Sequence, residues 1–191
     1  MKQFNPERIA YYEANGWRAY YDHKWMRLLK LIISLAQEEF RIPFPFSLLA
    51  AYYVTRASAA WVPLDHDERV VQAYYEKFYR LARRYSGLSF DPAQVGALEL
   101  KYNDVHRRLA GKPDKTEFVD TMVALHSSLF EISQEQALES AELRVKANNT
   151  VDLITSGASR DVEGDWERIE TYLTQCYQSI ERARASRQDT Q

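Results

Sequence analysis

Apolar residues recur along most of this chain at alternating steps of three and four positions, the spacing that keeps them on one face of an α-helix. Near the C-terminus, this face comprises Val162, Trp166, Ile169, Leu173, Cys176 and Ile180. A second such face comprises Val71, Tyr74, Phe78, Leu81 and Tyr85. The strict alternation of apolar and polar residues that is typical of β-strands is nearly absent. The pattern therefore predicts an all-α protein.

Residues that start and stop helices divide the pattern into segments. Asn5 followed by Pro6 predicts the start of a helical region that extends to about Phe40, with Gly16 as a candidate break. The predicted N-caps of later helices are Asp65, Asp91, Asp114 and Ser133. Further helices are predicted over about 46–61, 65–87, 91–110, 114–131 and 133–156, and from about 161 onwards.

The predicted helices are separated only by short loops. The chain shows neither a repeat of fixed period nor a linker long enough to separate two domains. We therefore expect a single-domain bundle of six or seven helices with short loops, covering residues 1–185. Residues 186–191 are too polar to pack and are predicted to form a flexible C-terminal tail.

Composition and charge narrow the possible function classes. The 191-residue chain is 46% hydrophobic and 27% charged, which is typical of one globular domain. Because 25 Lys and Arg residues nearly balance 27 Asp and Glu residues, no strong positive field favours nucleic acid or an anionic membrane. No apolar run approaches the roughly 20 residues that span a bilayer. The N-terminal sequence lacks the apolar core of a secretory signal, so we expect a cytoplasmic protein.

The segment ALELKYNDVHRRLAG combines polar groups with a core-facing helix surface. The apolar positions of this helix are Val95, Leu98, Tyr102, Val105 and Leu109. Glu99 and His106 flank that face, whereas Asp104 and Arg107 are predicted on the solvated side. Glu99 and His106 are seven residues apart, about 10.5 Å along a helix, so they cannot hydrogen-bond with each other. Any partner of either residue must come from another helix.

His126 on the next predicted helix is a candidate partner for Glu99. The short loop between the two helices favours an antiparallel hairpin, and counting residues outwards from that loop places Glu99 and His126 at similar depth. If the two side chains meet, the carboxylate stabilises the imidazolium and raises the pKa of His126. The alternative is that each is a core group satisfied by an ordinary hydrogen bond.

Two further polar residues lie on predicted apolar faces. Glu39 ends the core stripe of the first helical region. Arg56 lies in a helix of tyrosines and small residues, where its guanidinium needs an anion such as Glu39 or a ligand carboxylate. A structural pair of these two residues is the competing interpretation. Together, the residues that could line an internal polar pocket are Glu39, Arg56, Glu99, Tyr102, His106 and His126.

The sequence contains no recognised metal or nucleotide motif. The residue three positions before each histidine is never acidic, so the Glu-x-x-His pair of di-iron bundles is missing. No His-x3-His or Cys-x2-Cys spacing predicts zinc, and no glycine-rich phosphate loop precedes a helix. Cys176 lies within an apolar stripe and is predicted to be a buried structural thiol. The sequence thus predicts no metal site and identifies no cofactor.

Two hypotheses for function follow from these observations. The first is a non-enzymatic helical module that associates with itself or with another protein through an exposed part of its aromatic-rich surface. The second is a small-molecule or metal-binding protein, or an enzyme, that uses the internal polar pocket. The sequence alone names no substrate and no reaction.

Overall fold

The all-α prediction is confirmed for residues 5–188, the part of the chain that the structure, a computed structural model, describes. These residues form eight α-helices and no β-strand. The helices are α1 (Pro6–Tyr21), α2 (Trp25–Phe40), α3 (Phe46–Trp61), α4 (Glu68–Ser86), α5 (Pro92–Leu109), α6 (Thr116–Phe130), α7 (Gln134–Thr155) and α8 (Val162–Gln188). The helix count therefore exceeds the predicted six or seven by at least one. Helix α8 also continues through residues 186–188 of the predicted tail, and residues 189–191 lie outside the described part.

The additional helix arises because the first helical region is interrupted at residues 22–24 and not at Gly16. His23 has a left-handed backbone with φ of 57°, which ends α1. The backbone N–H groups of Asp22 and Lys24 close the turn on the carbonyl oxygens of Arg18 and Ala19. Gly16 lies inside α1, where α2 packs close to it. Gly16 is thus an internal position of α1 and not a helix break.

Local capping explains most helix starts. Asn5 caps α1 and Asp91 caps α5, each before a proline. Ser133 and Gln136 form the predicted capping box of α7. Helix α4 begins later than expected, because Asp67 and not Asp65 accepts the bond from the backbone of Arg69. The predicted N-cap Asp114 does accept a bond from Thr116 N–H, but no capping box forms at α6.

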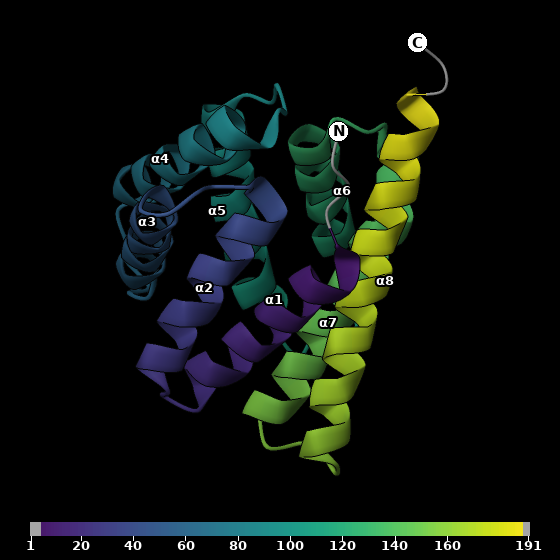
Figure 1. The fold of residues 1–191 in the computed structure, drawn as a ribbon. Coiled ribbons are helices and arrows are strands. Elements are labelled where there is room, and N and C mark those ends of the chain that lie inside the picture. Colours follow the sequence, from purple (N-terminus) through teal and green to yellow (C-terminus); the bar gives the residue numbers. More distant parts are fainter. Residues whose placement is uncertain (1–4, 189–191) are drawn as a thin grey trace.

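The helices pack mainly against their neighbours in sequence, and α1 also packs along α8. Figure 1 shows α3 and α4 at one edge of the bundle and α8 at the opposite edge, with α1 and α2 crossing between them. Helix α3 lies at the outside, where it contacts α2 and α4.

The apolar stripe predicted on α8 is buried from Trp166 to Ile180, while Val162 at its start is 45% exposed. The stripe on α4 is rotated from the predicted one. Tyr75 and Tyr79 are buried, whereas Tyr74 and Tyr85 are only half-buried. The reason is that α3 and α5 pack on two different sides of α4, which a single stripe cannot describe.

Candidate functional site

A buried ion pair joins α1 to α7 inside the bundle. The two terminal guanidinium nitrogens of Arg144 contact Glu13, with Nη1 2.6 Å from Oε2 and Nη2 2.5 Å from Oε1. Their side chains are 12% and 9% exposed, respectively. Such a two-pronged pair holds the carboxylate and the guanidinium in one plane, which fixes the orientation of both helices.

Both residues occupy positions where helical spacing calls for apolar side chains. Arg144 falls on a stripe of α7 made by Ala137, Ala141, Asn148 and Val151. Glu13 falls between Ile9 and Gly16 on the buried face of α1. Because the spacing places each charge inside, burial requires that the two charges neutralise each other.

Neighbouring side chains complete the surroundings of the ion pair. The Tyr177 hydroxyl of α8 donates to Glu13 Oε2 at 2.8 Å. The Arg144 guanidinium lies over the Trp17 ring, 4.9 Å from its centroid. Asn148 donates to the backbone carbonyl of Arg144. The Arg144 Nε atom is buried and has no hydrogen-bond partner, so the cluster does not satisfy every donor it contains.

Tyr102 connects this cluster to α5. Its hydroxyl donates to Asn148 Oδ1 at 2.9 Å, and burial raises the pKa of Tyr102 to about 12. The phenol therefore remains a neutral hydrogen-bond donor. Its ring stacks on Phe118 of α6, with centroids 5.7 Å apart.

Two further carboxyl groups, Glu39 and Glu99, face the same region. Burial, and then the charge of Glu13, raise the pKa of Glu39 well above its ordinary value. Burial also raises the pKa of Glu99, although the hydrogen bond from the Tyr79 hydroxyl, 2.9 Å long, opposes the rise. Burial is thus the main cause that raises the pKa of both carboxyl groups, and the charge of Glu13 adds to it, whereas the charge of Arg144 opposes it.

The predicted contact between Glu99 and His126 does not form. Glu99 is bonded to Tyr79, whereas His126 Nδ1 lies 2.8 Å from Ser140 Oγ on α7. Because Ser140 donates its only hydroxyl proton to Ala137 O, His126 must donate from Nδ1. Burial, with the charge of Arg144, lowers the pKa of His126 to about 3. The condition for a raised histidine pKa, contact with Glu99, is therefore not met, because His126 bonds to Ser140 of α7 instead.

The other two predicted pocket residues lie apart from Arg144. His106 Nε2 is 3.0 Å from Asp152 Oδ1 of α7, and its ring stacks on Phe118. Arg56 is exposed on the outside of α3, with its guanidinium 5.5 Å from the centre of the Tyr74 ring. The expected contact of Arg56 with Glu39 is absent among the described residues. The cluster thus gathers four of the six predicted residues, Glu39, Glu99, Tyr102 and His126, all electrostatically coupled to Arg144.

The sequence prediction missed Glu13 and Arg144, the centre of the cluster. A signal was present, because each charge interrupts an apolar stripe at the expected helical step. The two stripes were easy to overlook in the sequence, because most of their residues are small ones such as alanine and glycine.

The buried cluster offers little for metal or thiol chemistry. Within residues 5–188, no three His, Cys, Asp or Glu side chains are arranged to hold a metal ion. Cys176 is 1% exposed, and burial raises its thiol pKa to about 12, which keeps it unreactive. The prediction of a buried structural thiol is confirmed. A shallow surface hollow between α7 and α8 is lined by Glu139, Glu142, Leu143, Lys146, Gln175, Gln178 and Arg182, so no predicted pocket residue lines it.

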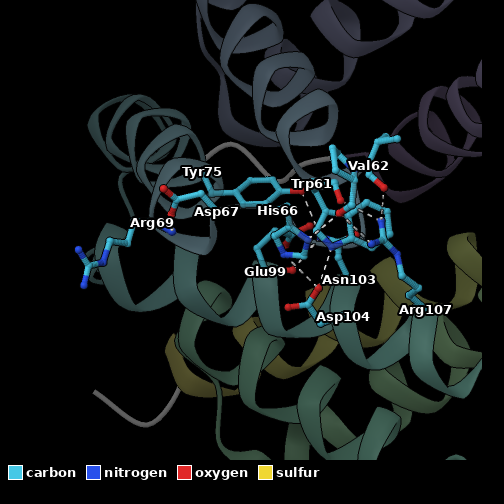
Figure 2. Close-up of polar contacts among 11 residues, drawn as sticks. Trp61, Val62, His66, Asp67, Arg69, Tyr75, Glu99, Asn103, Asp104 and Arg107 are labelled. Carbon is cyan, nitrogen blue, oxygen red and sulfur yellow. Dashed lines mark hydrogen bonds and ion pairs between the residues drawn. The ribbon is translucent and has the colours of Figure 1, made fainter.

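Figure 2 shows a second polar cluster, where the loop after α3 is held against α5. Trp61 donates from its indole to Asp104 Oδ1 at 2.8 Å. The Arg107 guanidinium stacks over the Trp61 ring, 3.4 Å from its centroid, and donates to the carbonyl oxygens of Trp61 and Val62. The sequence placed Asp104 and Arg107 on a solvated face. In the structure both are half-buried, because the α3–α4 loop covers them.

His66 belongs to the same loop cluster. Its Nδ1 atom lies 3.0 Å from the Pro63 carbonyl, which can only accept, so Nδ1 carries a proton. Its Nε2 atom is buried without a hydrogen bond and faces Asp104 Oδ1 at 3.6 Å. These contacts hold the loop between α3 and α4 against α5, and we call this arrangement the clasp.

The exposed apolar side chains concentrate on a different part of the molecule. Among the described residues, eleven of the sixteen large apolar side chains that are exposed lie between Tyr20 and Leu64. Leu64 is 86% exposed and Phe44 is 71% exposed, and these two residues bracket α3. Scattered exposed apolar residues are normal, but their concentration in one segment marks a candidate interaction surface.

Comparison with known proteins adds no information on function. No family model, no curated protein and no solved structure matches the chain. Within the described residues, no helix has the length and apolar character needed to span a membrane.

Proposed function

We propose that this protein is a non-enzymatic, cytoplasmic helical module that binds another protein chain through the exposed surface of α3. The observation that carries the proposal is the periodicity of that surface. Five of its exposed positions, counting the C-cap Val62, follow alternating steps of four and three, and they are Leu48, Tyr52, Thr55, Ala59 and Val62. We call these five residues the α3 seam. Such a stripe normally faces a neighbouring helix.

The α3 seam has no partner helix within the described chain. Leu48 is 43%, Tyr52 51% and Val62 56% exposed. The opposite face of α3 packs on the bundle through Ser47, Ala50, Ala51 and Ala57, all buried. Helix α3 is therefore apolar on both faces, although only one contributes to the core. Burial of the second face against another chain removes its apolar area from water, at roughly 25 cal/mol per Å².

The alternative of an internal ligand pocket has weaker support. The polar groups around Arg144 mostly bind one another. Arg56 lies away from them, and His106 stacks on Tyr102 but bonds to Asp152 instead. The contacts of this buried network hold α1, α5, α7 and α8 in their relative orientation without any ligand. An association role needs none of these groups to react.

Photo-crosslinking at position 52 tests the proposal. A photoreactive phenylalanine analogue in place of Tyr52 is expected to form a discrete adduct in the cells that make this protein. The same analogue in place of Tyr11, which is 45% exposed on α1, serves as the matched control. The absence of an adduct at positions 48, 52 and 59, or equal adducts at positions 52 and 11, would overturn the proposal.

A further inference from the structure

We infer that the partner of the α3 seam is an amphipathic helix with acidic residues beside its apolar stripe. This inference rests on the proposed function and specifies the chemistry of the partner. The seam covers fourteen residue steps, about 21 Å of helix. A partner helix of roughly the same length suffices to cover it, with its own apolar side chains at steps of three and four.

The sizes of the side chains along the seam favour a helix over an extended chain as the partner. Tyr52 is large, whereas Thr55 and Ala59, the next two positions, are small. Small residues between larger ones let bulky side chains of a crossing helix approach the backbone of α3 closely. An extended segment binds chiefly through backbone hydrogen bonds to a sheet edge, and an α-helix offers no such edge.

Two positive charges, Arg56 and Lys77, lie beside the middle of the seam. Arg56 is the only charged residue in α3. Its guanidinium is positioned by the Tyr74 ring of α4, and a hydrogen bond from Arg56 lowers the pKa of the Tyr74 phenol. Lys77 lies over Tyr53 and Tyr74, 6.0 and 5.2 Å from their ring centroids. Both cations are thus held along one side of the seam, where carboxylates of a partner can pair with them.

The same charges argue against a second copy of this chain as the partner. Helix α3 contains no Asp or Glu to pair with Arg56 of another copy. Two copies packed antiparallel about the middle of the seam would bring Arg56 close to its own counterpart, because Arg56 adjoins Thr55. Such like-charge contacts disfavour a pairing that apolar complementarity alone would permit.

Fluorescence anisotropy with labelled synthetic peptides tests the inference. The first peptide is an amphipathic helix of about 18 residues, with leucines at alternating steps of three and four and flanking glutamates. The second carries lysines in place of the glutamates, and the third keeps the glutamates but has serines in place of the leucines. We expect the acidic amphipathic peptide to bind at least about tenfold more tightly than either of the others.

Variants of the folded chain separate the inference from the proposed function. The double change Arg56→Glu and Lys77→Glu is expected to weaken binding of the acidic peptide at least about tenfold, with Arg160→Glu as an exposed control. Arg56→Gln, which removes one charge without reversing it, should have a smaller effect. The variant Tyr52→Ala should weaken binding of every amphipathic peptide, whereas Tyr11→Ala should not.

Each outcome tests either the acidic character of the partner or association at the α3 seam. Equal binding of the acidic and lysine peptides, or no effect of the double charge reversal, overturns the acidic partner while Tyr52→Ala still reports association at the seam. No effect of Tyr52→Ala on any peptide overturns the seam itself. A dimer of the chain alone in sedimentation equilibrium, abolished by Tyr52→Ala, overturns the acidic partner in favour of a second copy.

Discussion

Arg144 and Glu13, separated by 131 positions in sequence, form a two-pronged ion pair that ties α7 to α1 inside the bundle. A buried pair of this kind contributes little net stability compared with apolar residues of the same size, but the loss of one member leaves an uncompensated charge. The pair therefore makes the correct docking of α1 against α7 a condition for folding without strain.

Removing only the guanidinium should be severely destabilising. Arg144→Met leaves Glu13 buried without its cation, and we expect a loss of about 3 to 5 kcal/mol in the free energy of unfolding. The double variant Glu13→Leu with Arg144→Met should recover most of that loss. Urea denaturation followed by circular dichroism measures both. As a control, Arg108→Met breaks an exposed pair with Glu117 and should cost less than about 1 kcal/mol. A loss in Arg144→Met as small as in the control would contradict this account.

Glu39 should make the protein less stable as the pH rises above about 4.5. The unfolded chain releases the Glu39 proton near 4.5, whereas the raised pKa keeps that proton on the folded state. Between pH 4.5 and the raised pKa of Glu39, the folded state binds more protons than the unfolded state. The free energy of unfolding therefore falls as the pH rises, by at most about 1.4 kcal/mol per pH unit for one group. Glu39→Gln removes this dependence and should stabilise the protein at neutral pH.

The measurement is a series of urea titrations between pH 4.5 and pH 8, read as the difference between the variant and the unchanged protein. The exposed substitution Glu142→Gln on α7 is the control and should leave the slope unchanged. Identical slopes for Glu39→Gln and the unchanged protein would show that Glu39 is not the buried acid described above.

His126 should act in the opposite direction and over a lower range of pH. Its ordinary pKa is 6.5, and the folded protein lowers it to about 3. Below pH 6.5 the unfolded state therefore binds more protons, and the free energy of unfolding falls as the pH falls toward 3. Nitrogen NMR of the imidazole should show a neutral ring protonated at Nδ1 at pH 5. A positively charged ring at that pH, in protein that remains folded, would contradict the lowered pKa, and a neutral ring protonated at Nε2 would contradict the donation from Nδ1 to Ser140.

The stripe of α8 should behave as core. Ile169 and Leu173 are both 0% exposed, so replacing either with alanine should cost about 2 to 5 kcal/mol through lost burial and the cavity left behind. Val162→Ala, at the exposed start of the same helix, should cost much less. Thermal and urea denaturation measure these differences. Equal costs at the three positions would mean that α8 does not dock as described.

The clasp between Arg107 and Trp61 should depend on the shape of the side chain as well as its charge. Arg107→Lys keeps the positive charge but loses the planar fork that stacks on the indole and reaches two carbonyl groups. We expect a loss of about 1 to 2 kcal/mol and faster proteolytic cleavage within residues 62–67. Arg69→Lys, an exposed control on α4, should change neither quantity. Unchanged cleavage in Arg107→Lys would mean that other contacts hold the loop.

Features that depend on near neighbours in the chain can be predicted from the sequence. The capping residues Asn5, Asp91 and Ser133 act within three positions, and helical spacing repeats every few residues. A local pattern is enough to specify such features, which is why the helical class and the buried stripe of α8 were predicted correctly. The break at His23 was missed because a left-handed backbone at a residue other than glycine carries little signal in sequence.

Which polar groups meet depends on how the helices pack against one another. Arg144 contacts Glu13 and not an acid closer to it in sequence, and His126 contacts Ser140 and not Glu99. The reason is that the rotation of each helix about its axis, and the angle at which it crosses its neighbours, determine which side chains meet. The exposure of the α3 seam was likewise decided by position. A stripe of apolar residues predicts that a helix face can be buried, but it is buried only where another helix lies against that face, and α3 lies at the outer edge of the bundle.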